Sequence, residues 1–353
     1  MKKIFFFCFL FLFLFPISVF ADRGKATVVM DVDSGRILYS KNAHEQKLIA
    51  STTKIMTCIV VLENSNLENE ITVGEEVLSM YGTNIYLEVG EKIKVNDLLY
   101  GLMLRSGNDA AMTLAVNTLG EDSFVQKMNE KSKELGMNDT LFFNPHGLDE
   151  ETENISSAND MALLSRYAYQ NPIYRKIIST KKYSAKSSLK SYVWYNRMSL
   201  FSQYEYCVGG KNGYTPKAGK SLVSYAKKND TLLTIITLDD NDIYYNHKML
   251  YEEYFDNYQK YIIIDKNNFF VPSTYSEDNL YLKRSFSYPL SNREIDEVKT
   301  ILELFPTHKD NVAGKVIIQL QGKKIGSLDV YAKKKKKKTS FPQSIIDWIS
   351  GKS

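Results

Sequence analysis

The 353-residue chain has few of the residues that build disulfide frameworks or metal sites, with only three cysteines and four histidines. Cys8 lies in the N-terminal segment, and Cys58 and Cys207 alone do not make a disulfide framework. We expect Cys58 to be a buried apolar side chain, and the sequence leaves a pairing with Cys207 open. The histidines show no ligand spacing, because His44-Glu45 is not followed by the second histidine of a zinc-protease motif.

The sequence also lacks an apolar run long enough to cross a bilayer. The longest run, 4–15, has 12 residues, whereas a spanning helix needs roughly 20. It follows two lysines and precedes Val19-Phe20-Ala21, so residues 1–21 are predicted to be a signal peptide cleaved after Ala21. The alternative is an uncleaved anchor. We therefore expect an exported protein that acts outside the cytoplasm.

A strong charge imbalance is absent as well. Removing 1–21 takes away two lysines and no acid, which lowers the net charge from +4 to +2. The run 333–338 supplies six lysines, and without them the remainder would carry −4. A broad nucleic-acid-binding face is therefore not expected.

Three short polar strings are present in order along the chain: Ser51-Thr52-Thr53-Lys54, Ser106-Gly107-Asn108 and Lys211-Asn212-Gly213. A serine hydroxyl is a poor nucleophile and needs a base. If a helix begins at Ser51, Lys54 lies over the same face, three residues on. The helix N-terminus, burial and the nearby Lys211 would all lower the pKa of Lys54 and favour a neutral amine.

The other two strings suit the binding of a peptide. Ser106 and Asn108 lie at a predicted break between two helices, where Ser106 is expected to relay a proton between Lys54 and a leaving amine. Asn108 is expected to hold Lys54 and the amide of the substrate. Lys211 is expected at the end of a strand, where Gly213 leaves room for a peptide to lie as an added strand. Lys211 would then attract a terminal carboxylate.

The pattern of apolar residues predicts an α+β fold with two domains in the mature chain. A hairpin over 26–39 comes first, helices follow, and strands within 208–238 complete the sheet. Expected helices include 51–62, 97–104 capped by Asn96, 160–170 capped by Asn159, and 242–258. We expect a catalytic domain over 22–262 and a small all-β domain over 266–332.

The residues around the strings resemble D-alanyl-D-alanine carboxypeptidases, the low-molecular-mass penicillin-binding proteins. The segments that carry this resemblance are 50–57, 104–111, 143–148 and 210–215, and it extends over roughly 24–260. It implies a β-lactamase/transpeptidase-like catalytic domain that removes the terminal D-alanine from peptidoglycan pentapeptides through an acyl-enzyme. It also implies acylation by β-lactam antibiotics, and no metal or organic cofactor.

The resemblance further implies a role for individual residues. Ser51 would be the nucleophile and Lys54 the base, with an oxyanion hole formed by the backbone N–H groups of Ser51 and Tyr214. Asn212 stands where the family usually has a threonine that helps to bind the carboxylate, and Thr215 is expected to share that task. His146, in a His-Gly-Leu loop, is a further site candidate, and a loop-packing histidine is the alternative.

Two rival functions remain open at this point. A serine β-lactamase has the same three strings, although the Ser-Gly-Asn form and the extra β domain disfavour it. An inactive cell-wall-binding homologue is motivated only by Asn212.

The C-terminal segment 333–353 combines the lysine run with apolar residues at helical spacing. It is expected to be a basic amphipathic tail, and a candidate membrane anchor. A solvated tail is the alternative.

Overall fold

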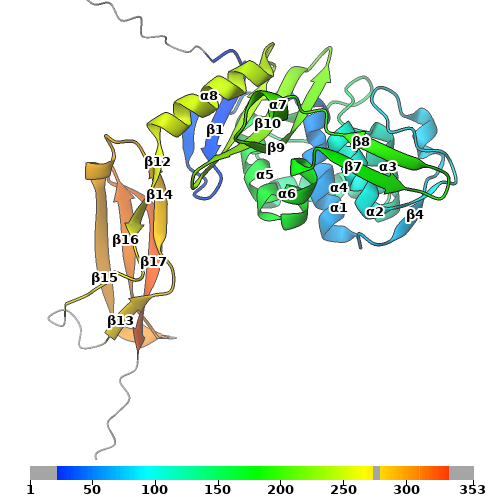
Figure 1. The fold of residues 1–353 in the computed structure, drawn as a ribbon. Helices are drawn as coiled ribbons and strands as arrows, with labels where there is room; N and C mark the ends of the chain where they lie inside the picture. Colours follow the sequence, from blue (N-terminus) through cyan, green and yellow to red (C-terminus); the bar gives the residue numbers. More distant parts are fainter. Residues whose placement is uncertain (1–21, 273–278, 310, 334–353) are drawn as a thin grey trace, which may run out of the picture.

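The computed structural model describes residues 22–272, 279–309 and 311–333, so the expected signal peptide and all but the first residue of the tail lie outside the described residues. Figure 1 shows a larger body of mixed helices and strands, and a second, elongated body made of strands. Within the described part of the chain, no helix is long and apolar enough to cross a membrane.

The larger body is built on a five-stranded sheet in the order β2-β1-β11-β10-β9, with neighbouring strands antiparallel. Its strands are β1 (Ala26–Asp31), β2 (Ile37–Lys41), β9 (Cys207–Thr215), β10 (Gly219–Lys228) and β11 (Thr231–Leu238). The first strand of the chain pairs with the last of the sheet, which confirms that distant segments assemble it. β9 is an edge strand, so one side of its backbone is open to a further strand.

Both faces of this sheet are covered by helices (Figure 1). Because side chains alternate along a strand, Val28 and Ile236 join the core on one face while Val29 and Ile235 join the core on the other. α8 (Ile243–Asn257) covers the second face. The helices on the first side are α1 (Lys54–Asn64), α2 (Val95–Tyr100), α3 (Asn108–Thr118), α4 (Glu121–Glu134), α5 (Ala158–Gln170) and α6 (Pro172–Ser179).

Two predicted helix caps are wrong. α2 already includes Asn96, whose amide donates to the Tyr183 hydroxyl at 3.0 Å. α5 is capped by Ser157 and not by Asn159, because Ser157 has the extended backbone of a cap and its hydroxyl accepts from the Asp160 N–H at 3.2 Å. α6 is not among the helices expected from the sequence. It begins at Pro172, because proline is well suited to the first position of a helix.

Several short elements between the helices were also not foreseen. They are the strands β3 (Lys47–Leu48), β4 (Glu70–Thr72), β5 (Lys92–Lys94), β6 (Ile155–Ser156), β7 (Lys182–Lys186) and β8 (Ser191–Tyr195), and the helix α7 (Leu200–Gln203). β7 and β8 form a hairpin whose alternate residues, Tyr192 and Trp194, are buried in the first core.

The second body contains a four-stranded antiparallel sheet in the order β13-β17-β16-β15 and a separate pair, β12 with β14. The strands are β12 (Gln259–Ile264), β13 (Asn279–Leu282), β14 (Phe286–Leu290), β15 (Val298–Lys309), β16 (Val312–Leu320) and β17 (Lys323–Lys333). The expected boundary at 262 falls inside β12, which follows α8 after one residue. Arg36 joins the two bodies, because its guanidinium pairs with Glu294 and donates to the Pro289 carbonyl.

The two cysteines of the described chain are both free and buried. Cys58 belongs to the core on the α1 side of the sheet and Cys207 to the core on the α8 side. The pairing that the sequence left open is thus absent from the structure, and burial raises the pKa of both thiols.

Candidate active site

Ser51 lies in a 3₁₀ turn, Ala50–Thr53, and Lys54 is the first residue of α1. The predicted helix start at Ser51 is therefore a tighter turn, but the predicted contact is present, since Lys54 Nζ lies 3.1 Å from Ser51 Oγ. Lys54 is fully buried.

Two further oxygen atoms contact the Lys54 nitrogen. Asn108 Oδ1 lies at 2.7 Å and the backbone oxygen of His146 at 2.5 Å. Both are acceptors, so a neutral amine would donate its two N–H groups to them and keep its lone pair for the Ser51 hydroxyl. Burial, and next the charge of Lys211, hold the pKa of Lys54 well below its usual value. The geometry and the pKa direction agree with the expected base.

The second string lies at a helix break, as predicted. A π-helical turn, Gly101–Arg105, ends at Ser106, which has a left-handed backbone with φ of 65°, and α3 begins at Asn108. The Asn108 amide nitrogen donates to the Tyr81 carbonyl at 2.7 Å. The sequence predicted that the Asn108 side chain binds the amide of the substrate. One hydrogen of the Asn108 amide is bound to the loop that carries Tyr81.

Lys211 lies inside β9 and not at a strand end, which corrects the expectation from sequence. Its Nζ donates to Ser106 Oγ at 3.0 Å and to the backbone oxygen of Asn212 at 2.6 Å. Ser106 thus contacts Lys211, whereas its expected partner was Lys54. Burial, with a smaller contribution from Arg197, lowers the pKa of Lys211 to about 7.

β9 passes directly beside the nucleophile. A Cβ atom on Gly213 would lie 2.9 Å from the Ser51 nitrogen and 3.1 Å from the Ile49 oxygen, so only glycine allows this approach. Tyr214 follows at the open edge with 63% of its surface exposed. The expected oxyanion hole, the N–H groups of Ser51 and Tyr214, therefore belongs to two segments in contact.

Thr215 does not fit the task that the sequence suggested for it. Its hydroxyl donates to the carboxylate of Asp149 and accepts from the Ala218 N–H at 3.0 Å, and the side chain is buried. The hydroxyl is therefore not free to bind a substrate carboxylate. Asp149 was missed from sequence, because an aspartate in a loop carries no spacing signal.

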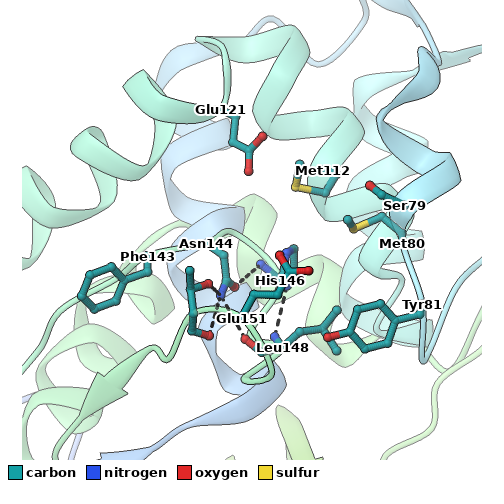
Figure 2. A pocket seen from close by; sticks show the side chains of 11 residues that line it. Ser79, Met80, Tyr81, Met112, Glu121, Phe143, Asn144, His146, Leu148 and Glu151 are labelled. Carbon is teal, nitrogen blue, oxygen red and sulfur yellow. Dashed lines mark hydrogen bonds between the residues drawn. The ribbon is translucent and has the colours of Figure 1, made fainter.

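His146 contributes its backbone carbonyl to the base, and its ring packs within the loop. Ring Nδ1 accepts from the Leu148 N–H at 3.1 Å. Burial, and then the charge of Lys54, lower the pKa of His146 to about 3, so the ring stays neutral. With Tyr81, Met112 and other side chains it lines a cavity of about 240 Å³ (Figure 2).

Two asparagines that sequence reasoning missed organise this loop. Asn144 Oδ1 accepts from the N–H groups of His146 and Gly147 at 3.2 and 2.6 Å. Asn154 binds the loop through the Asn144 carbonyl at 2.9 Å and the nucleophile turn through Thr53 Oγ1 at 3.0 Å. The loop is thereby fixed against the turn that carries Ser51.

Within the described ranges, no group of three or more His, Cys, Asp or Glu residues could hold a metal ion. A serine hydroxyl beside a buried lysine whose pKa is lowered is the arrangement of a serine hydrolase that works through an acyl-enzyme. The family model described as D-alanyl-D-alanine carboxypeptidase matches residues 18–242. The chain belongs to this family of serine peptidases.

Individual relatives agree with this assignment. The chain is 29% identical over 361 residues to the D-alanyl-D-alanine carboxypeptidase DacF of Bacillus subtilis, covering 95% of this chain and 92% of the relative. It is 34% identical over 219 residues to the D-alanyl-D-alanine carboxypeptidase of Streptomyces sp. strain K15, covering 56% of this chain and 75% of that protein. Penicillin-binding protein 5 of Haemophilus influenzae superposes with a TM-score of 0.75 at 26% identity, covering 88% and 97% of the two chains. The fold is therefore of the penicillin-binding type, as the sequence predicted.

Gly147 provides a test of the contact between the loop and the nucleophile turn. It has a φ of 85°, and a Cβ atom there would lie 2.0 Å from the Ala50 oxygen. We expect Gly147→Ala to slow acylation of Ser51 by a fluorescent penicillin by at least about tenfold, because misplaced catalytic groups lose rate steeply. Gly90→Ala is the matched control, with φ of 84° and no atom within 4 Å. Equal rates for the two variants would contradict the packing argument.

Proposed function

We propose that this protein is a D-Ala-D-Ala carboxypeptidase that removes the terminal D-alanine from peptidoglycan pentapeptides through an acyl-enzyme on Ser51. The observation that carries the proposal is the buried Lys54 amine beside the Ser51 hydroxyl. Family membership and the open edge of β9, where a peptide fits as an added strand, support it.

In the acylation step, the peptide lies along β9 with its terminal carboxylate toward Lys211 and Asn212. Lys54 takes the proton of Ser51 as Oγ attacks the carbonyl carbon of the penultimate D-alanine. The negative charge that develops on the carbonyl oxygen is stabilised by the N–H groups of Ser51 and Tyr214. The C–N bond then breaks, and the nitrogen of the terminal D-alanine gains a proton.

Ser106 is placed to deliver that proton. Because its oxygen accepts from Lys211, its own O–H is free to donate to the leaving nitrogen. The proton that Lys54 took from Ser51 then replaces the one that Ser106 gave up, so Lys54 is neutral again. In the deacylation step, Lys54 takes a proton from water, which attacks the ester, and the proton returns to Ser51 as the C–O bond breaks. A β-lactam would acylate the same serine by opening its ring.

The first test follows D-alanine release from a pentapeptide and, in parallel, the mass of the penicillin-treated protein. We expect release by the wild type, none by Ser51→Ala, and a long-lived penicillin adduct on the peptide that contains Ser51. Rapid turnover of benzylpenicillin would favour a β-lactamase instead. Absence of both release and adduct in the folded wild type would favour an inactive cell-wall-binding protein.

The second test uses the pKa of Lys211. Since burial lowers this pKa to about 7, the side chain is charged below pH 7 and loses its charge as the pH rises. We expect kcat/KM for a peptide ending in a carboxylate to fall as the pH increases through about 7. The same peptide with a terminal amide should lack this alkaline decrease, and an identical decrease for both would remove Lys211 from carboxylate binding.

For the location of the protein, we propose export through residues 1–21 and attachment to the membrane surface through 333–353. These assignments follow from the sequence pattern and fit an enzyme that acts on peptidoglycan outside the cytoplasm. We also propose that the catalytic domain starts at residue 22 and ends with α8, and that the β domain begins with β12.

Deletion of 333–353 tests the anchor directly. We expect the truncated protein to move from the membrane fraction to the soluble fraction while its penicillin-binding rate stays unchanged, because the tail lies outside the proposed catalytic domain. A truncated protein that stays membrane-bound would place the anchor elsewhere, for example in an uncleaved N-terminus.

A further inference from the structure

Three segments meet at the nucleophile: the turn of Ser51, the loop that carries His146, and β9. Two glycines, Gly147 and Gly213, touch the turn. Two residues after each of them lies one partner of a single hydrogen bond. Gly147 packs on the Ala50 carbonyl and precedes Asp149, while Gly213 packs on the Ser51 nitrogen and precedes Thr215. The hydrogen bond from Thr215 to Asp149 therefore joins the loop to the strand.

We propose that Asp149 is a positioning residue for the oxyanion hole and acts through Thr215 and β9. This inference rests on the proposed function. The Thr215 hydroxyl donates to Asp149 and accepts from the Ala218 N–H, so it fixes the end of β9 directly after Tyr214. The Tyr214 N–H is thereby held at a constant distance from the Ser51 N–H.

Burial makes this link specific. Asp149 and Thr215 are only 5% and 8% exposed, and a buried carboxylate is retained only where hydrogen bonds compensate for the loss of water. Lys217 adds a second, more exposed contact, in which its Nζ donates to the Asp149 backbone oxygen at 2.7 Å. Because this contact uses the backbone, it persists when the Asp149 side chain is changed, so side-chain substitutions isolate the carboxylate.

The consequence for catalysis is a selective effect on the chemical step. An oxyanion hole binds the transition state more strongly than the substrate, so a shift of β9 lowers kcat with little change in KM. If Thr215 instead bound the substrate carboxylate, its loss would raise KM, and only for peptides that end in a carboxylate. The two roles therefore predict different kinetic signatures.

The experiment compares disruptive and conservative variants of the full chain. Asp149→Ala and Thr215→Val remove the acceptor and the donor, whereas Asp149→Asn and Thr215→Ser keep them. We expect the first two to lower kcat about 10- to 100-fold for carboxylate and amide peptides alike, on the scale seen for small misplacements. The conservative pair should stay within about threefold of wild type, and the double variant Asp149→Ala/Thr215→Val should be no slower than either single one.

Ser34→Ala is the matched control for general destabilisation, because Ser34 also donates a hydroxyl to a buried carboxylate, that of Asp31, in the β1–β2 hairpin. It should lower the thermal midpoint without lowering kcat.

Three results would overturn the inference: a wild-type kcat in Thr215→Val, additive losses in the double variant, or an effect confined to the KM of carboxylate peptides. If the disruptive variants fail to fold, the conservative variant decides. A kcat of Thr215→Ser that lies well below the expected range of about threefold from wild type, while Ser34→Ala keeps its kcat, would overturn the inference equally. An inactive wild type would instead refute the proposed function.

Discussion

The site depends on one constraint: the Lys54 nitrogen is buried, and burial disfavours its charged form. A neutral amine has two hydrogens and one lone pair, and Lys54 finds two acceptors, Asn108 Oδ1 and the His146 carbonyl, beside the hydroxyl of Ser51. These partners come from three distant parts of the chain. The helix break before α3 and the loop of His146 are therefore shaped to meet one nitrogen atom.

The same constraint connects the two lysines. Lys211 lowers the pKa of Lys54 through its charge, while its own pKa is lowered by burial. Two ammonium groups in one buried site are unfavourable, so the charge of Lys211 favours the neutral form of Lys54. Lys211 lies on the strand that we assign to the substrate carboxylate, whereas Lys54, whose pKa is lowered further by that charge, lies beside the nucleophile.

The sequence predicted the parts of the site that depend on side-chain identity. Ser51, Lys54 and Asn108 were placed correctly relative to one another because helix geometry and a glycine break act locally. The carbonyls of His146 and Tyr81 could not be predicted, since every residue has a backbone carbonyl and only the fold selects one. For Thr215 the residue was noticed, but its partner Asp149 is 66 positions away in sequence, and so the role assigned to it was wrong. In the fold, α6 was missed because proline both ends and starts helices, whereas the five-stranded sheet was foreseen from its buried runs.

The open edge of β9 has a further consequence for the behaviour of the protein in solution. An unpaired strand edge that can accept a peptide can also accept a strand of another copy, which is how many sheets aggregate. Here Gly209 and Gly210 have φ values of 149° and 156°, outside the regular strand conformation, and they shorten the regular part of the edge. A short, irregular edge leaves few regular positions for a second strand, so these two glycines disfavour a long ladder between copies of this chain.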